Sequence, residues 1–186
     1  MTRNETVRGK RIVIPENPVS AFLFNDTRSA LIWLVIRLYL GYQWLNAGWH
    51  KVTNPAWVGA DAGKSVTGFV NGALAKAAEG KDVTGWYAAF LENVVLPNAK
   101  VFSYMVAFGE VLVGLGLILG LLTGIAAFFG SFMNVVFLFA GTISTNPLLF
   151  ILATWLVLAW KVAGWYGLDR WALPFLGTPW SRRDAN

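Results

Sequence analysis

The stretch RLYLGYQWLNAGWHK, residues 37–51, lies in a segment that is otherwise apolar enough to cross a membrane, yet it begins with an arginine. About 20 consecutive apolar residues in a helix span the hydrocarbon core of a bilayer. An arginine inside such a helix costs free energy unless a polar group meets it. The stretch therefore predicts a membrane helix in which Arg37 has a buried partner.

The composition agrees with a membrane protein. Of the 186 residues, 56% are hydrophobic and 13% are charged, which is more apolar than an ordinary soluble domain. The chain has no cysteine and one histidine, His50, so we expect no iron–sulfur cluster, no haem held by two histidines and no metal site. The net charge of +5 is dispersed at the ends of apolar runs, so we also expect no nucleic-acid binding.

Four segments are long enough to cross the bilayer as helices. They cover residues 28–49, 101–122, 124–144 and 147–166. A short LLTG link between the second and third predicts a tight helical hairpin, and Pro147 suits the first turn of the fourth. The predicted fold is an all-α integral membrane protein, a single domain (1–186) built on an antiparallel bundle of four transmembrane helices.

Both ends of the chain are expected on the cytoplasmic side of a prokaryotic plasma membrane. Four spans place the termini on one side, which carries nine lysines and arginines against five in the long connection. That excess favours a cytoplasmic location by the positive-inside rule. Residues 1–27 then form a cytoplasmic or interfacial segment, with 18–24 along the inner interface, and residues 167–186 form a cytoplasmic tail.

Residues 50–100, between the first two spans, predict two short amphipathic helices that cap the outer end of the bundle. The apolar residues at helical spacing in the first are Val66, Phe69, Val70, Ala73, Leu74 and Ala77. In the second they are Trp86, Phe90 and Val94. Such a cap serves either as plain structure or as a lid that gathers substrate.

Charged and polar residues also occur where the helices should be in lipid. Arg37 and Glu110 lie near the middle of the first and second spans, and antiparallel packing would place them at a similar depth. We therefore expect an ion pair, which either sets the register of two helices or takes part in binding or proton transfer. Asn134 falls at a similar depth in the third span and is expected to hydrogen-bond the pair or to link helices.

Two stripes run along the first span on roughly opposite faces. One carries Tyr39, Gln43, Asn46 and His50, and the other carries Arg37, Gly41, Trp44, Gly48 and Lys51. One stripe could line a ligand cavity while the other packs against a neighbouring helix. The polar side chains could equally be ordinary interhelical hydrogen bonds.

The order and spacing of several motifs carry a resemblance to a known family. The motifs are residues 37–51, NPAW (54–57), WYAAFL (86–91), GEVLVGLGLILG (109–120), NVVFLFAGTISTNP (134–147) and AGWYGLDR (163–170). In the order and spacing of these motifs the chain resembles the DoxX/DoxD family of membrane proteins, over nearly its whole length after residue 18. It is similar in particular to the DoxD-type small subunit of thiosulfate:quinone oxidoreductase.

That resemblance implies oxidation of thiosulfate to tetrathionate outside the membrane, with quinone as a diffusible electron acceptor and generally with a DoxA-like subunit as partner. It makes Arg37 and Glu110 candidate catalytic residues, and it makes His50 and Lys51 candidates for binding the anionic substrate. The candidate quinone-binding residues are Tyr39, Gln43, Trp44, Asn46 and Asn134. Membrane lipid and a second copy of the chain are further candidate partners.

Two other functions stay open. The chain could be a non-catalytic membrane subunit that recruits or stabilises a redox or sulfur-handling enzyme. It could also be a small transporter or lipid-binding protein, which charges in the middle of the spans would suit. Whether the chain is an enzyme without a partner is therefore open.

Overall fold

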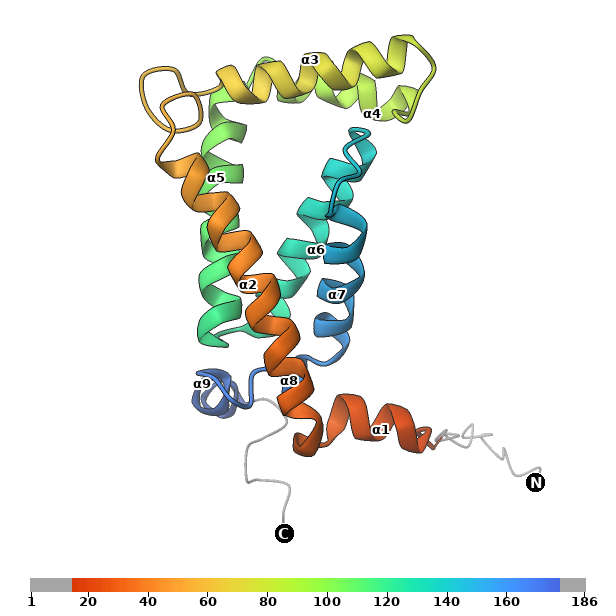
Figure 1. Ribbon diagram of the computed structural model, residues 1–186, viewed down its shortest axis with the longest axis vertical. Helices are drawn as coiled ribbons and strands as arrows, with labels where there is room; N and C mark the ends of the chain where they lie inside the picture. The colour runs from red at the N-terminus through yellow and green to blue at the C-terminus, as the bar shows by residue number, and fades with distance from the viewer. Residues whose placement is uncertain (1–14, 178–186) are drawn as a thin grey trace, which may run out of the picture.

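The computed structural model describes residues 15–177, and this part of the chain consists of helices joined by turns and short loops, without a strand. Four longer helices run along the molecule: α2 (Ala30–Val52), α5 (Ala99–Leu119), α6 (Thr123–Phe139) and α7 (Asn146–Leu158). Figure 1 shows them side by side between a helical cap at one end and short helices at the other. Their bounds lie close to the predicted segments, except that the fourth segment breaks after Leu158 and continues as α8 (Trp160–Ala163).

The closest helix pair is α2 with α5, and its spacing depends on glycine. A Cβ at Gly48 would lie 2.6 Å from the backbone nitrogen of Val111, and one at Gly41 would lie 2.8 Å from the side chain of Ile118. Any side chain at these positions would push the helices apart. The second close pair is α6 with α7, and α5 joins α6 through the predicted tight turn.

The end of the bundle opposite the cap, which we call the inner end, is covered by α1 (Pro18–Asn25), which is bent by 67° from the helix that begins at Thr27. The Asn17 side chain caps α1, and the Asp26 side chain accepts a hydrogen bond from the backbone of Arg28 in the 3₁₀ turn η1 (Thr27–Ser29). Trp33 Nε1 donates to the carbonyl of Leu23 at 2.7 Å, which holds α1 across the bundle rather than along it. Residues 18–24, predicted to lie along the inner interface, form most of this helix.

The cap contains α3 (Lys64–Ala78), α4 (Gly85–Phe90) and the π-helical turn η2 (Leu91–Val95). The face predicted for α3 is buried or partly buried. The face predicted for α4 is wrong, because Tyr87, Leu91 and Val95 are buried there while Trp86 is 62% exposed. These three residues form an apolar stripe that packs into the core of the cap, and the hydroxyl of Tyr87 also donates to the carbonyl of Val136 at 2.9 Å.

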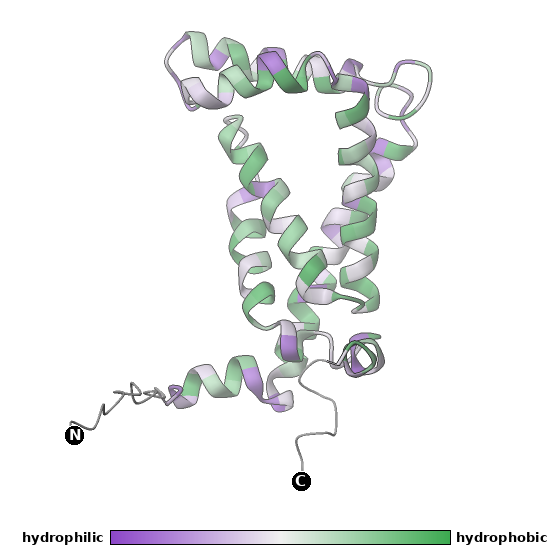
Figure 2. Ribbon diagram, turned by 180° about the vertical axis from the view of Figure 1, so that it is seen from behind, coloured by the Kyte–Doolittle hydropathy of each residue, from purple (hydrophilic) through white to green (hydrophobic). Residues whose placement is uncertain are grey.

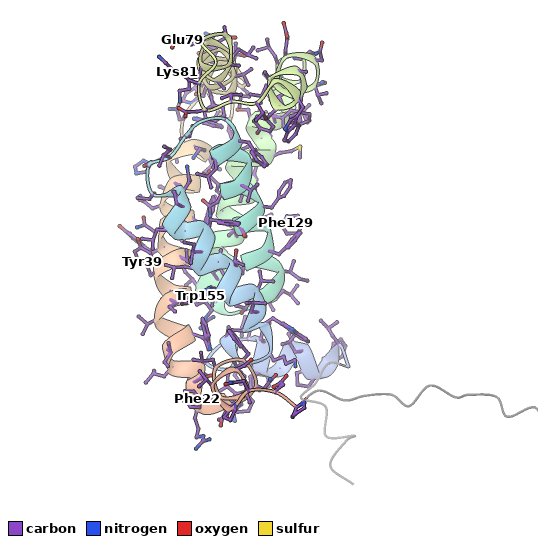
Figure 3. All side chains as sticks on the ribbon, turned by 90° about the vertical axis from the view of Figure 1, so that its right-hand side faces the viewer. Phe22, Tyr39, Glu79, Lys81, Phe129 and Trp155 are labelled. Carbon is purple, nitrogen blue, oxygen red and sulfur yellow. The ribbon has the colours of Figure 1, made fainter. Side chains whose placement is uncertain are left out.

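The outside of the bundle is apolar. Large hydrophobic side chains project from all four long helices, among them Tyr39, Phe129 and Trp155 in Figure 3. Figure 2 shows hydrophobic residues predominating along these helices. Within the described residues, α5 alone has both the length and the hydropathy of a membrane span, or two spans qualify if the bent pair of α1 with the helix from Thr27 counts as one. Helices α6 and α7 are apolar but shorter, at 17 and 13 residues.

Candidate functional site

Arg37 does not meet Glu110, so the predicted ion pair is wrong. Its Nη2 donates to the carbonyl of Tyr166 at 3.0 Å, and its Nη1 lies 3.5 Å from the carbonyl of Ile118. The guanidinium also fills the space beside Gly120, where a Cβ would collide with it. Arg37 therefore lies at the α5–α6 turn, with 1% of its surface exposed.

The error comes from the register of α2 against α5. The prediction assumed that both helices start and end at the same depth, but α2 extends further inward than α5 (Figure 1). Gly48 is the residue that lies beside Glu110 and Val111. Arg37 lies about 11 residues before Gly48 in α2, which places it roughly 16 Å from Gly48 along the helix axis.

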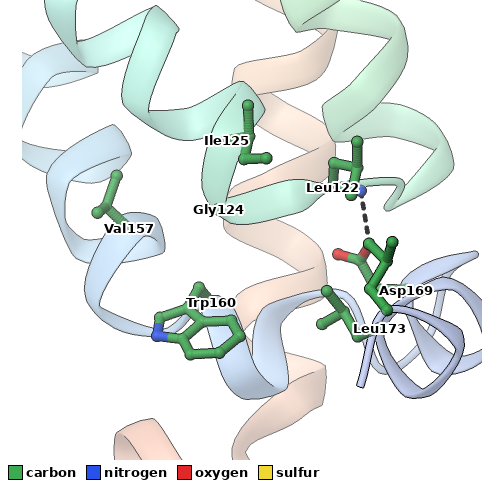
Figure 4. A pocket seen from close by; sticks show the side chains of 8 residues that line it. Leu122, Gly124, Ile125, Val157, Trp160, Asp169 and Leu173 are labelled. Atoms are coloured by element: carbon green, nitrogen blue, oxygen red, sulfur yellow. Dashed lines mark hydrogen bonds between the residues drawn. The ribbon is translucent and has the colours of Figure 1, made fainter. Parts of the chain in front are cut away.

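Around Arg37 the chain forms what we call the inner clasp: the side chains of Arg37 and Asp169, the carbonyl of Tyr166, and the N–H groups of Leu122 and Thr123. Asp169, the first residue of α9 (Asp169–Phe175), is fully buried. Its carboxylate accepts from the N–H groups of Leu122 at 2.6 Å and Thr123 at 2.9 Å, as Figure 4 shows for Leu122. The clasp thus caps the start of α6 and ties the segment after α8 to the α5–α6 turn.

Sequence reasoning missed the role of Asp169. The available signal was its place in the AGWYGLDR motif, a charged residue directly after an apolar run. Gly164 is required beside it, because a Cβ there would overlap the Asp169 side chain. Two polar atoms of this region, Arg37 Nε and Thr123 Oγ1, have no hydrogen-bond partner in residues 15–177.

A cavity of about 300 Å³ adjoins the clasp between α6, α7, α8 and α9. Its walls include Ile125, Val157, Trp160 and Leu173 (Figure 4). The carboxylate of Asp169 on this wall is already bound to backbone N–H groups. The cavity suits an apolar group and offers little for polar chemistry.

The partner of Glu110 is Lys51, which was predicted to bind an anionic substrate. Lys51 Nζ lies 2.6 Å from Glu110 Oε2, and the two side chains are 21% and 2% exposed. The lysine reaches back from the end of α2, and its Nζ lies 5.1 Å from the centre of the Trp57 ring. Ser103 Oγ donates to the Trp57 carbonyl at 2.6 Å and so holds the loop in place.

Two further polar side chains of the bundle are buried: Trp44 is 3% and Asn134 is 0% exposed. Trp44 Nε1 and both polar atoms of the Asn134 amide have no hydrogen-bond partner within residues 15–177. Trp44 lies against Gly130 and Val113. Asn134 is one helical turn outward from Gly130, and Glu110 is one turn outward from Val113, so Glu110 and Asn134 share a level.

We call Trp44, Lys51, Glu110 and Asn134 the outer polar layer. The predicted depth of Asn134 agrees with this arrangement, although its amide does not bond to the ion pair. An unsatisfied buried polar group costs about 1–3 kcal/mol, so the unpartnered atoms of Trp44 and Asn134 make these two side chains candidates for contact with a polar ligand group.

The other candidate residues do not join this layer. Tyr39, Asn46 and His50 are exposed and Gln43 is half-buried, and all four lie on the outward face of α2. His50 and Lys51, predicted as one anion site, therefore point to different sides of the helix. Of the two stripes, the one with Gly41, Trp44 and Gly48 packs inward.

A family model matches this chain over residues 32–142, and its description is DoxX. No curated protein and no solved structure matches the chain. The matched stretch runs from α2 to the end of α6 and contains Arg37 and the whole outer polar layer. Because it covers more than half of the chain, the protein belongs to the DoxX family and is membrane-associated.

Proposed function

We propose that this chain is a membrane subunit of a quinone-linked sulfur oxidoreductase that oxidises thiosulfate to tetrathionate. The observation that carries the proposal is the outer polar layer. It combines a buried ion pair with two buried side chains that have unused hydrogen-bonding atoms, inside helices with apolar outer surfaces. The motif resemblance to DoxD-type subunits supplies the substrate class.

Trp44 and Asn134 are suited to the two redox states of a quinone head group. The indole N–H and the amide Nδ2 donate to a quinone carbonyl, while the amide Oδ1 accepts from a quinol hydroxyl. An asparagine can therefore hold the head group before and after reduction. Tyr39, Gln43 and Asn46 lie on another face and have no part in this site.

In the proposed reaction, Glu110 transfers protons and Lys51 supplies positive charge. Two thiosulfate ions give up one electron each and form a sulfur–sulfur bond, and one quinone takes up the two electrons together with two protons. In this proposal Glu110 carries a proton, and its support is the ion pair with Lys51, whose side chain is 21% exposed. Lys51, at the outer end of α2, attracts the thiosulfate dianion to that side, whereas His50 points to another side of the helix and has no part in this site. Arg37 acts as a positioning residue through the inner clasp.

The membrane arrangement is part of the proposal: four spans with both termini in the cytoplasm. In the described residues, the charges within the long helices are the buried Arg37 and Glu110 and the mostly buried Lys51, apart from Lys100 at the start of α5. Arg28, Lys161 and Arg170 gather at the inner end. The other basic residues of the orientation argument, in 1–14 and 178–186, lie outside the described residues. The short α6 and α7 would require the bilayer to thin locally.

A second function is supported by the polar residues on the outward face of α2. A membrane subunit without chemistry of its own would use such a face to bind another subunit, such as a DoxA-like protein. The two functions make different predictions for Glu110, because a purely structural subunit tolerates an isosteric change there.

The test uses membranes from source cells in which the gene is deleted and then restored as wild type, Glu110→Gln or Glu92→Gln. Glu92 is an exposed glutamate in the cap and provides a matched control. Thiosulfate-dependent quinone reduction per folded chain should vanish on deletion, return with wild type and Glu92→Gln, and fall at least tenfold in Glu110→Gln.

Full activity after deletion would refute the sulfur oxidoreductase assignment. Activity that requires the chain but is unchanged in Glu110→Gln would favour the non-catalytic subunit.

A further inference from the structure

The four long helices differ in what they present to the outside of the bundle. The exposed positions of α5, α6 and α7 are almost entirely apolar, such as Leu112 at 68%, Phe132 at 56% and Ile151 at 49% exposure. The inner half of α2 is similar, with Leu31 and Val35 exposed. These surfaces suit lipid chains and need no protein partner.

The outer half of α2 is different. Tyr39, Gln43, Asn46 and His50 follow one another on one side of the helix, and we call them the α2 polar face. None of these four side chains forms a hydrogen bond within residues 15–177. Exposed Tyr42 and Trp49, at 63% and 62%, flank them.

Gln43 and Asn46 lie alongside the apolar span α5, within the depth that α5 would cover in a membrane. Gly41 lies against Ile118 and Gly48 lies against Val111, so both amides are level with the interior of the membrane span α5. In hydrocarbon an amide finds hydrogen-bond partners only on another helix, and such bonds favour helix association. The α2 polar face is therefore expected to be covered by a helix rather than by lipid.

We propose that the covering helix is α2 of a second copy, in a parallel homodimer with its two-fold axis along the membrane normal. Two copies inserted in the same direction bring identical residues together at equal depth. The amides of Gln43 and Asn46 each contain a donor and an acceptor, so each can pair with its own copy. Tyr39, Gln43 and Asn46 carry no formal charge, so these parts of two like faces meet without repulsion.

This interface is separate from the proposed redox site. The α2 polar face and the stripe that packs on α5 are on different sides of α2, so dimer formation leaves the outer polar layer unchanged. Its test is therefore independent of thiosulfate or quinone activity.

The chain contains no cysteine, which makes single-cysteine reporters simple to interpret. In native membranes under mild oxidation, Asn46→Cys should form a disulfide-linked dimer in most copies, since residues near a two-fold axis meet their own counterpart. Leu112→Cys, at an exposed apolar position on α5, should stay monomeric. An excess of unlabelled wild-type chain should lower the dimer fraction of Asn46→Cys.

A second measurement counts subunits by single-molecule photobleaching in liposomes over a range of protein densities. Wild type should dimerise, and the double variant Gln43→Leu with Asn46→Leu should raise the dissociation constant at least tenfold. The control pair Leu112→Ala with Leu115→Ala should leave it unchanged. Single wild-type chains at every density, or an Asn46→Cys adduct with a protein of another mass, would overturn the homodimer.

Discussion

The inner clasp and the outer polar layer both bury charge in one bundle, but they differ in what satisfies it. In the clasp, Arg37 bonds to two backbone carbonyls and Asp169 accepts from two backbone N–H groups. In the outer polar layer, Lys51 and Glu110 bond to each other, and the layer also contains an indole N–H and an amide without partners in residues 15–177.

The difference indicates which cluster supports the fold and which is available for chemistry. A buried charge bonded to the backbone of other elements fixes the positions of those elements. A charge that another side chain neutralises, in a layer with unused donors and acceptors, can exchange its partner for a ligand or a proton. We therefore assign stability to Arg37 and reactivity to Glu110.

The largest effect is expected from Arg37→Leu. It leaves the carbonyls of Ile118 and Tyr166 without a donor and Asp169 without a nearby positive charge, a loss of about 3–5 kcal/mol. Unfolding in detergent should show it, and Arg28→Leu is the control because Arg28 has a 79% exposed side chain. Equal stability of the two variants would refute the role of the clasp.

Lys51→Met should be the next most harmful change, because it leaves the Glu110 carboxylate buried without a counter-charge, at about 3 kcal/mol. Adding Glu110→Leu to the same chain should recover most of that loss, since the unpaired charge is then gone. A double-mutant cycle in unfolding free energy measures this coupling. Strictly additive losses would mean that the pair is not coupled in the folded protein.

Gly48→Ala tests the α2–α5 contact that sets the level of both clusters. The new methyl group would meet the backbone of Val111, and we expect a loss of about 1–3 kcal/mol. Gly72→Ala in α3 meets no atom within 4 Å and should be neutral or slightly stabilising. A shift in thermal unfolding only for Gly48→Ala would support the register in which Gly48 lies beside Val111, whereas an unchanged Gly48→Ala would contradict that register.

The smallest effect should come from Tyr87→Phe, which removes the bond from the cap to Val136, a loss of about 0.5–1.5 kcal/mol. Burial raises the pKa of Tyr87 to about 12. Because that value lies above the value of about 10 expected in the unfolded chain, wild type should lose stability as the pH rises from about 10 to about 12. Unfolding as a function of pH should show less of this loss in Tyr87→Phe, and identical curves would show that Tyr87 does not titrate in this window.

Local rules were sufficient to predict the helices from the sequence. The length of the apolar segments predicted the four long helices, and Pro147 predicted the start of α7. The spacing of apolar residues in α3 predicted its buried face. Each of these features depends on residues close together in the chain. The face of α4 failed because a second apolar stripe at helical spacing, Tyr87, Leu91 and Val95, packs into the cap core, and the bond from Tyr87 to Val136 adds to that preference.

The site was predicted only in part for the same physical reason. The sequence singled out Arg37, Glu110, Lys51 and Asn134, but their pairing depends on how far α2 slides along α5. The position of α2 along α5 is set by the packing of Gly41 and Gly48 on α5 and by how far α2 extends past the α5–α6 turn. Neither feature can be read from the sequence of one helix alone. Asp169 was missed because its partners are two N–H groups on α6, far away in the sequence.

The most direct test of the difference between the clusters compares Glu110→Gln with Arg37→Lys in thiosulfate-dependent quinone reduction per folded chain, in restored source membranes. Both changes keep a hydrogen-bonding group of similar size. We expect Glu110→Gln to keep less than a tenth of wild-type activity, while Arg37→Lys lowers stability but keeps most of the activity. Full activity in Glu110→Gln together with its loss in folded Arg37→Lys would contradict the assignment of reactivity to Glu110 and stability to Arg37.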